Sequence, residues 1–454
     1  MKRMMRLLIV LVLLLGSFLT PVATAANNNV GINIVLKVPV TDEILRDLSG
    51  YGQVRDVLYQ INAVMLYGRA SHLSALRALP YVRAADQDAE ASAPPLDTVE
   101  AEDFLDGINT WNLDAINVTD FGEGRTIGYS GEGTYVAVLD SGLVQNWRQF
   151  FPEERIAEEY AVAFGGGGAS GNQITQLPDK WEHDTSSHGT HVTSSIIGYD
   201  FFGTPVNGVA PLATIIPVKI LNQNGSGWWS VIAYGIVYVA DLKAGPLAGH
   251  PVVINMSLSG SQPNAVLEAA VDYAISKGVI VVAAAGNAGE AGMGYPGAYP
   301  QVISAAAAGW EEQFTTPTWW FGLDVPNPTD PDDFFIADFS GREQPGKDLD
   351  VAAPGVFVVG PFQASKGHAS YFFLSGTSMA SPHVAGTAAL MAEKNPALTQ
   401  AQAESNLENT AVPLLPGCSD VIDPSSGNLV EVCWGADATG EGLIQADAAV
   451  NATP

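Results

Sequence analysis

The chain is poor in basic residues, and this scarcity limits the partners it can have. Only 20 of its 454 residues are lysine or arginine, against 48 aspartates and glutamates, so the formal net charge is −28. The whole excess lies after residue 100, because the first hundred residues carry nine basic and nine acidic side chains. Such a surface repels phosphate backbones and anionic headgroups. We therefore expect no nucleic acid and no membrane surface among the partners of the mature protein.

The sequence also lacks a second long apolar stretch. Its first one, Leu7 to Leu19, is too short for a comfortable membrane span. A basic start, a short apolar core and small residues before a cleavage point are the parts of a secretory signal. We expect residues 1–25 to be a signal peptide and the protein to be secreted; the alternative is an uncleaved anchor. The basic and the small residues are Lys2, Arg3 and Arg6, and then Ala23, Thr24 and Ala25.

Cysteine is nearly absent. The chain has two cysteines, Cys418 and Cys433, and they lie close together in sequence. In an exported protein this pattern predicts a disulfide, which would stabilise the fold by roughly 3 kcal/mol in the chain-entropy model. The alternative is a pair of free, buried thiols.

Three segments contain residues that are suited to catalysis. Residues 135–139 form an apolar run that ends in Asp140, as expected for a buried strand with a carboxylate at its C-terminal edge. His188 begins a run of small and apolar residues suited to a helix. Ser378 lies among small residues at the start of another such run, where unpaired backbone N–H groups can hold developing negative charge. Pro382 fits this interpretation if it lies in the first helical turn, which does not need its N–H.

These blocks resemble those of the subtilisin-like serine proteases, the subtilase family. The resemblance rests on Val138-Leu139-Asp140-Ser141-Gly142, His188-Gly189-Thr190-His191-Val192, Gly376-Thr377-Ser378-Met379-Ala380-Ser381-Pro382 and, for the oxyanion asparagine, Ala284-Ala285-Gly286-Asn287. It covers nearly the whole chain. The resemblance implies an α/β fold: a three-layer domain with a mostly parallel central sheet, preceded by a small ferredoxin-like α+β propeptide.

The resemblance also implies a role for each residue. Ser378 would attack the peptide carbonyl, His188 would take and return the proton, and Asp140 would orient the imidazole. Asn287 and the backbone N–H of Ser378 would bind the oxyanion. No cofactor would be required for this chemistry. We assign His191 and His383 to structure, because each lies a turn or more into its expected helix.

The same resemblance predicts a substrate groove. Residues 225–230 and 257–259 resemble the two edge segments that hold an extended peptide by backbone hydrogen bonds, and the pocket for the residue before the cleaved bond would be deep and apolar. We expect broad specificity with a preference for large apolar residues there. Ser259 departs from the family pattern, which often has glycine, so it leaves the groove width open. The predicted substrate-binding residues are Ser226, Gly227, Trp229, Ser257, Leu258, Ser259, Ala284, Ala285, Gly286 and Gly294.

Residues 26–98 are expected to form a propeptide. Their pattern predicts the order strand, helix, strand, strand, helix, strand of a ferredoxin-like unit, followed by a linker over about 89–106. By resemblance this unit would act as an intramolecular inhibitor that the enzyme removes itself; the alternative is a subdomain retained in the mature protein. Residues 99–454 would form the catalytic domain.

Metal binding stays open at this stage. An insertion at about 309–338 contains Trp319, Trp320 and Phe321, and then Asp324, Asp330, Asp332 and Asp333. Oxygen-rich clusters can hold Ca²⁺, and a solvated acidic loop is the alternative. The segment Glu182-His183-Asp184 is better explained as a polar loop than as a metal cluster.

The sequence therefore predicts a secreted serine endopeptidase, a monomer that is made as a precursor and acts on proteins or peptides. A non-catalytic relative would have lost a residue of the triad, and none is missing here. The serine-carboxyl peptidases replace the histidine with an acid, and lipases follow a different order of catalytic residues.

Overall fold

The computed structural model describes residues 29–93, 97–100, 110–120, 124–168, 171–315, 324–365, 368–424 and 426–454. The expected signal peptide and Trp319, Trp320 and Phe321 lie outside these ranges. None of the helices in the described part of the chain combines the length and apolar character needed to cross a bilayer.

The N-terminal unit has the predicted order of elements. Its four strands form one antiparallel sheet in the order β2-β3-β1-β4, and two helices connect them. Thr41 caps the first helix by accepting a hydrogen bond from the Ile44 N–H (3.3 Å). The elements are β1 (Asn29–Leu36), α2 (Asp42–Leu48), β2 (Gly52–Leu58), β3 (Ala63–Arg69), α3 (Leu73–Arg77) and β4 (Val82–Gln87).

A nine-stranded sheet forms the centre of the remaining chain. Its order is β11-β10-β14-β9-β16-β17-β18-β19, and β20 also pairs with β18. All of its pairs are parallel except β10 with β11 and β18 with β19. The strands are β9 (Tyr135–Asp140), β10 (Val162–Gly167), β11 (Asn172–Leu177), β14 (Thr214–Lys219), β16 (Val252–Met256), β17 (Val279–Ala284), β18 (Ile303–Trp310), β19 (Phe334–Ile336) and β20 (Val351–Pro354).

Helices cover both faces of this sheet, so the domain has the three layers that the sequence predicted. In β9, Val136 and Val138 pack into one apolar core, while Ala137 and Leu139 pack into the other. The first core includes residues of α5 and α8, and the second includes residues of α6 and α7. The helices are α4 (Trp111–Asp114), α5 (His188–Ile197), α6 (Trp229–Ala244), α7 (Ala265–Ser276), α8 (Thr377–Lys394), α9 (Gln400–Thr410) and α10 (Ala446–Ala452).

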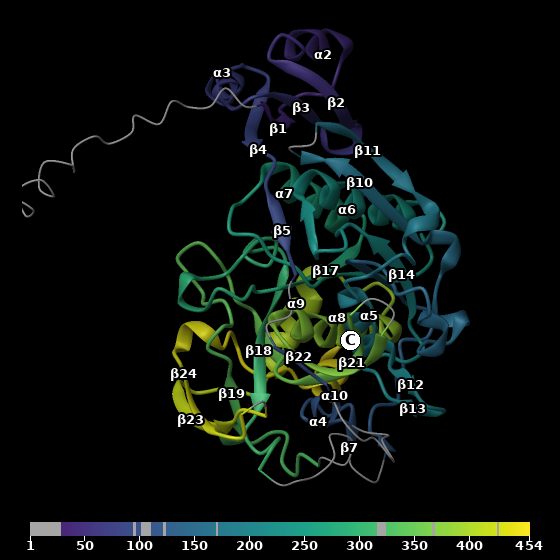
Figure 1. Cartoon of the computed structure of the whole chain (residues 1–454), viewed down its shortest axis with the longest axis vertical. Coiled ribbons are helices and arrows are strands. Elements are labelled where there is room, and N and C mark those ends of the chain that lie inside the picture. The colour runs from purple at the N-terminus through teal and green to yellow at the C-terminus, as the bar shows by residue number, and fades with distance from the viewer. Residues whose placement is uncertain are drawn as a thin grey trace, which may run out of the picture.

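The N-terminal unit lies against one end of this domain, next to α6, α7 and β11 (Figure 1). Two of its carboxylates meet the exposed N–H groups at helix starts. Asp88 accepts hydrogen bonds from the Ser230 N–H at the start of α6 (3.0 Å) and from the Ser230 hydroxyl (2.5 Å), and Asp86 accepts one from the Ala265 N–H at the start of α7 (3.2 Å).

The predicted linker is only partly a linker. Glu90–Ser92 forms strand β5, which pairs with β15 (Ser226–Trp228), and Asp97–Glu100 forms β6, which pairs with β22 (His368–Ser375). Composition alone missed these strands because their partners lie more than a hundred residues away. Residues 94–96 and 101–109 lie outside the described ranges.

Three hairpins complete the domain. The first joins β12 (Tyr199–Phe201) to β13 (Thr204–Val206), and the rings of Tyr199 and Phe201 in β12 contact that of Tyr371. Strands β21 (Val358–Ser365) and β22 form the second hairpin. The third joins β23 (Gly417–Ile422) to β24 (Leu429–Trp434), where Cys418 and Cys433 lie opposite each other and form the predicted disulfide. A short pair, β7 (Thr119–Asp120) and β8 (Gly124–Arg125), follows α4.

Candidate active site

Asp140 and His188 form a buried hydrogen-bonded pair. Asp140 is the last residue of β9 and His188 is the first of α5, so a strand end and a helix start meet at the same edge of the sheet. The His188 Nδ1 lies 2.9 Å and 3.0 Å from the two carboxylate oxygens, and both side chains are fully buried. The other ring nitrogen, Nε2, has no hydrogen-bond partner among the described residues. It is therefore free to accept a proton.

A second carboxylate, that of Asp184, supports this pair, a role that the interpretation of Glu182-His183-Asp184 as a polar loop did not include. The Ser141 hydroxyl donates a hydrogen bond to Asp184 (2.8 Å) and accepts one from the Gly189 N–H (2.9 Å), so it links the end of β9 to the start of α5. Lys219 donates to the Ser141 carbonyl. Burial raises the pKa of Asp184 to about 6, although the positive charge of Lys219 opposes the rise.

Ser378 is the second residue of α8, in the first turn, where N–H groups have no partner four residues earlier within the helix. Its hydroxyl lies 3.2 Å from the Ser257 carbonyl oxygen, to which it donates, and its side chain is buried. The hydroxyl is therefore not hydrogen-bonded to His188 in this state. Catalytic hydrogen bonds are often absent or long without substrate and form in the reacting complex.

The expected position of Pro382 was wrong. It is the sixth residue of α8 and so lies beyond the first turn. Proline removes the N–H that would bond to the carbonyl four residues earlier, which is the carbonyl of Ser378. The Ser257 hydroxyl donates to that carbonyl instead (2.7 Å). Pro382 thus leaves the Ser378 carbonyl without its donor in the helix, and the Ser257 hydroxyl takes the place of that donor.

Asn287 is held in one orientation by Thr377. Its Oδ1 accepts hydrogen bonds from the Thr377 N–H (2.9 Å) and the Thr377 hydroxyl (2.8 Å). The remaining amide nitrogen, Nδ2, lies beside Gly376, where an added Cβ would be 3.3 Å from it. Because the oxygen is occupied, the amide presents its N–H groups next to the start of α8.

The groove beside these residues is filled by the chain itself. β5 pairs in antiparallel fashion with β15, so that Ser92 lies opposite Ser226. On its other side Ser92 exchanges two backbone hydrogen bonds of 3.0 Å with Ser259. The Ala93 N–H donates to the Gly225 carbonyl (3.0 Å). β6 then pairs with the end of β22, with Asp97 opposite Ser375. The described ends of the segment therefore flank Ser378.

Comparison with known proteins agrees with this geometry. The family model described as the subtilase family matches residues 131–442. The chain belongs to the subtilase family. Subtilisin E of Bacillus subtilis is 36% identical over 288 residues, which are 63% of this chain and 62% of that protein. Subtilisin Savinase of Lederbergia lenta is 38% identical over 290 residues, 63% of this chain and 86% of that protein.

Solved structures match more of the chain. The crystal structure of fervidolysin from Fervidobacterium pennivorans, described as a keratinolytic enzyme related to subtilisin, has a TM-score of 0.65 at 25% identity. That match covers 94% of this chain and 61% of fervidolysin. The S41 psychrophilic protease has a TM-score of 0.54 at 30% identity, over 75% of this chain and 98% of that structure. The predicted fold class is thereby confirmed.

In this subtilase three residues expected to line the pocket before the cleaved bond, Ser259, Gly286 and Gly294, lie close together. A Cβ added to Gly286 would lie 3.1 Å from the Gly294 nitrogen, and Ala284 and Ala285 are buried. A Cβ added to Gly294 would lie 2.9 Å from the Cβ of Ser259, and one added to Gly286 would lie 3.2 Å from the Ser259 hydroxyl. The Ser259 side chain therefore stands against both glycines, in the space that a glycine at 259 would leave open.

Trp229 is the first residue of α6 and is fully buried. It shares an apolar core with Ala91, Leu221 and Leu258, and Ala91 is paired with Gly227. The side chain of Ala91 is thus enclosed beside Trp229. The burial of Trp229 agrees equally well with simple core packing, so its role in substrate binding stays a prediction.

Two other histidines of the catalytic motifs are structural, as predicted. The His191 Nε2 lies 3.1 Å from the Val358 carbonyl oxygen. The His383 Nδ1 lies 2.7 Å from the Met379 carbonyl oxygen, and its Nε2 lies 2.7 Å from the amide nitrogen of Asn112. Burial lowers the pKa of His191 to about 3 and that of His383 to about 4, so both rings are neutral at pH 7.

One aspartate of the insertion, Asp324, belongs to an acidic group that could hold a metal ion. Among the residues described, Asp324 groups with Asp114 and Asp120, and a second group is formed by Asp350, Glu404 and Glu408. Asp330 instead starts a short 3₁₀ turn, where it accepts from the Asp332 N–H (3.1 Å). Asp184 bonds to Ser141 and Ser186, and Glu182 pairs with Arg148, so that segment is a polar loop as expected.

Proposed function

We propose that this protein is a serine endopeptidase that hydrolyses peptide bonds through Asp140, His188 and Ser378. The observation that carries the proposal is the buried Asp140–His188 pair at the sheet edge, together with a serine at the start of α8 and a groove that already holds an extended segment. The match of the subtilase family over residues 131–442 supports it.

The chemistry follows from this geometry. The Ser378 hydroxyl turns from the Ser257 carbonyl towards the free Nε2 of His188, which takes its proton as the oxygen attacks the peptide carbonyl. Asp140 accepts from Nδ1–H and stabilises the imidazolium that forms. The ring then returns the proton to the leaving amine. Water next attacks the acyl group, and His188 takes the proton of the water and returns it to the Ser378 oxygen as that oxygen leaves.

The oxyanion would be bound by two donors, the Nδ2–H of Asn287 and the backbone N–H of Ser378. Thr377 fixes the amide so that its nitrogen, and not its oxygen, faces the developing charge. Donors that are already oriented need no reorganisation during the reaction, which is why such groups contribute strongly to rate.

We further propose that the protein is exported as an inactive precursor and that residues 26–96 inhibit it. β5 and Ala93 occupy both edges of the groove by backbone hydrogen bonds, as an extended substrate would. Asp86 and Asp88 attach the N-terminal unit to the starts of α7 and α6. An external peptide cannot pair with the same edges until this segment leaves.

The sequence limits which peptide bond can be cleaved during maturation. Between Ala93 and Asp97 the chain reads Pro94-Pro95-Leu96, which lies outside the described residues. Proline has no N–H to donate to a groove edge. The bond between Leu96 and Asp97 is the one in this stretch that joins two residues other than proline, and Leu96 fits an apolar pocket. We place self-cleavage there, two residues before the boundary expected at residue 98.

Such cleavage needs a shift of the chain. Ser92 lies opposite Ser259, so antiparallel continuation by two residues would set residue 94 opposite Ser257, whose carbonyl contacts the Ser378 hydroxyl. To place Leu96 opposite Ser257, the segment must move along the groove by two residues. A shift by two residues keeps each side chain on the same face of the strand. The described register is then inhibitory, and processing is slow.

For substrates, we propose broad specificity with an apolar residue before the cleaved bond. Backbone pairing with β15 and Ser259 does not depend on the substrate's side chains. Gly286 and Gly294 give the pocket its depth, and Ser259 restricts its width.

Intact mass of the exported protein tests the proposal when wild type is compared with Ser378→Ala. We expect wild type to begin at Asp97 and the variant to retain the N-terminal unit. Equal masses that both include this unit would reject self-cleavage and favour a binding protein. Equal masses that both lack it would show that another protease performs the maturation.

A further inference from the structure

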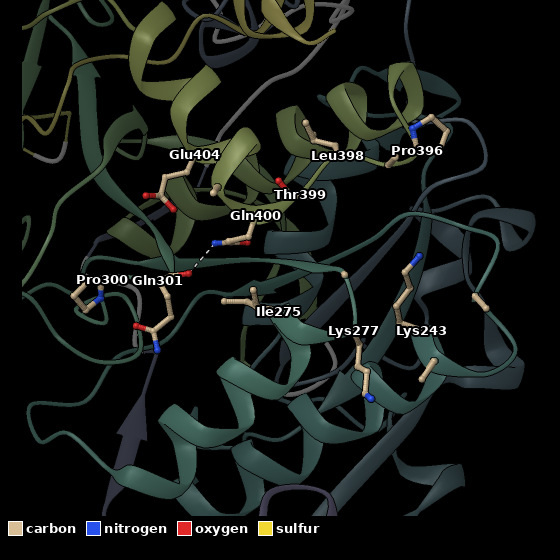
Figure 2. Close-up of a pocket in the computed structure, with 15 residues that line it drawn as sticks. Lys243, Ile275, Lys277, Pro300, Gln301, Pro396, Leu398, Thr399, Gln400 and Glu404 are labelled. Carbon is tan, nitrogen blue, oxygen red and sulfur yellow. Dashed lines mark hydrogen bonds between the residues drawn. The ribbon is translucent and has the colours of Figure 1, made fainter.

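Two surface pockets differ in their relation to the groove. One, of about 840 Å³, is lined by residues of α6, α7 and α9, with Gln400 of α9 at its wall (Figure 2). None of the described residues that line it is predicted to bind substrate. The other, of about 580 Å³, has Phe150 and Tyr199 among its lining residues. Both of these rings contact that of Tyr371 in β22, the strand that pairs with β6. The second pocket therefore borders the path of the chain beyond the active site.

Strand β6 marks that path. It pairs with β22 in antiparallel fashion, from Asp97 opposite Ser375 to Glu100 opposite Phe372. The next residue of β22 is Tyr371, so a longer strand on the same path would place its next residue opposite Tyr371. In the described register residue 94 comes opposite Ser257, beside the reacting serine. The residue opposite Tyr371 is therefore about the seventh after the cleaved bond.

Aromatic rings of the β12–β13 hairpin pack against Tyr371. The centroid of its ring lies 4.7 Å from that of Phe201 and 5.6 Å from that of Phe202. Its hydroxyl donates a hydrogen bond to the Asp200 carbonyl (2.9 Å), which holds the ring against the hairpin. Residues directly opposite each other in an antiparallel pair have their side chains on the same face, with Cβ atoms about 4.5–5.5 Å apart. A substrate side chain opposite Tyr371 would thus lie on the face that carries these rings.

Phe202 is the exposed member of this group and is unusual for its position. It is 83% exposed. With Gly203 it forms the two-residue turn between β12 and β13, and both residues have a positive φ, 49° and 92°. Asparagine followed by glycine is the preferred pair in such a turn, because asparagine tolerates this conformation and is polar. Phenylalanine there combines backbone strain with an exposed ring, and the hairpin requires neither. Such an outlier indicates a use for the side chain.

We propose that Phe202 and Tyr371 bind an apolar side chain of the substrate, about seven residues after the cleaved bond. This inference rests on the proposed endopeptidase function. The part of the substrate after the cleaved bond pairs with β22 in place of β6, because cleavage before Asp97 leaves β6 with a free end. A large apolar residue at the seventh position covers the exposed ring of Phe202. The enzyme therefore prefers long polypeptides with an apolar residue at that distance.

The test measures kcat/KM of the mature enzyme for a set of synthetic peptides. All share one sequence up to the third residue after the cleaved bond. A short peptide ends there, and the long ones continue with polar residues and carry either Phe or Ser at the seventh position. We expect Phe at this position to raise kcat/KM by about fivefold over Ser. Phe at the sixth or eighth position should give no such gain, because neighbouring residues of a strand face opposite sides.

Phe202→Asn supplies the residue that the turn prefers, so the fold should be at least as stable. It should abolish the gain from Phe and leave kcat/KM for the short peptide unchanged. The matched control is Leu429→Asn, which removes another exposed apolar side chain, on β24, and should keep the gain. The inference is overturned if wild type shows no gain, or if the gain persists in Phe202→Asn. Failure of wild type to cleave even the short peptide would instead overturn the proposed function, and this inference with it.

Discussion

At the scale of single residues, the reacting groups are oriented by neighbours that do not react themselves. Ser141 and Asp184 join the strand that ends in Asp140 to the helix that begins with His188. Thr377 orients Asn287, and Ser257 occupies the carbonyl that Pro382 leaves unpaired. Each contact fixes one atom that the proposed reaction needs. Substitutions at these positions should therefore change the reaction rate more than the stability of the fold.

Thr377→Val should lower kcat by roughly tenfold, less than the loss of a whole oxyanion donor, because the Thr377 N–H still holds Asn287. KM should change little, since the amide acts on the developing oxyanion. Steady-state kinetics on a peptide substrate measures both constants. Thr377→Ser keeps the hydroxyl and should restore the rate. An unchanged kcat in Thr377→Val would show that the hydroxyl does not orient the amide.

Ser259→Gly should widen the pocket that Gly286 and Gly294 line, because it removes the side chain standing against both. We expect kcat/KM for a substrate with Phe before the cleaved bond to rise by about tenfold relative to one with Ala. The measurement is the ratio of kcat/KM for two peptides that differ at this residue alone. A ratio equal to that of wild type would place Ser259 outside the pocket.

At the scale of elements, α8 does two things at once. Its first turn carries Ser378, and its interior spans the core on one face of the sheet, with Met379, Val384 and Leu390 fully buried. His383 lies in that interior as a neutral ring between Asn112 and the Met379 carbonyl. Acid should therefore act on this helix through His383.

His383→Gln should make the protein less sensitive to acid. The pKa of His383 falls from its ordinary 6.5 to about 4 in the folded state, so the unfolded chain binds the proton first as pH drops. This group's stabilisation is complete above about pH 6.5 and is lost towards pH 4, by about 3 kcal/mol. Urea unfolding of Ser378→Ala with and without His383→Gln, at several pH values, gives the two slopes. Equal slopes would assign the acid sensitivity elsewhere.

At the scale of the whole molecule, the N-terminal unit and the domain are joined by continuous chain that passes the active site. β5, before the proposed cleavage bond, pairs with β15, and β6, after it, pairs with the end of β22, so the chain is held on both sides of that bond. The two prolines between these strands would then decide which bond meets the serine.

Replacing both prolines, Pro94→Ala with Pro95→Ala, should speed maturation and move its position. Residue 94 would gain the N–H that an extended substrate donates, so the bond after it becomes cleavable without a shift of the chain. We expect a mature protein that begins at residue 95. Intact mass over time after synthesis shows both the rate and the new end. Maturation that still begins at Asp97 at the wild-type rate would contradict the proposed register.

The sequence by itself was sufficient for the fold class, the order of elements in the N-terminal unit and the disulfide. It was sufficient because a buried parallel strand such as β9 is a continuous apolar run, and helices begin with recognisable caps such as Thr41. Its motifs also named Asp140, His188, Ser378 and Asn287 as candidates, since each lies in a short block of distinctive residues.

Only the tertiary structure decided which distant groups meet. It brought Asp184 to Ser141, set Ser259 against two glycines, laid β5 beside β15 and grouped Asp324 with Asp114 and Asp120. The physical reason is common to all four. Local patterns record what neighbours along the chain prefer, whereas hydrogen bonds and repulsion between charges act across a few ångströms of space, however far apart the residues lie in sequence.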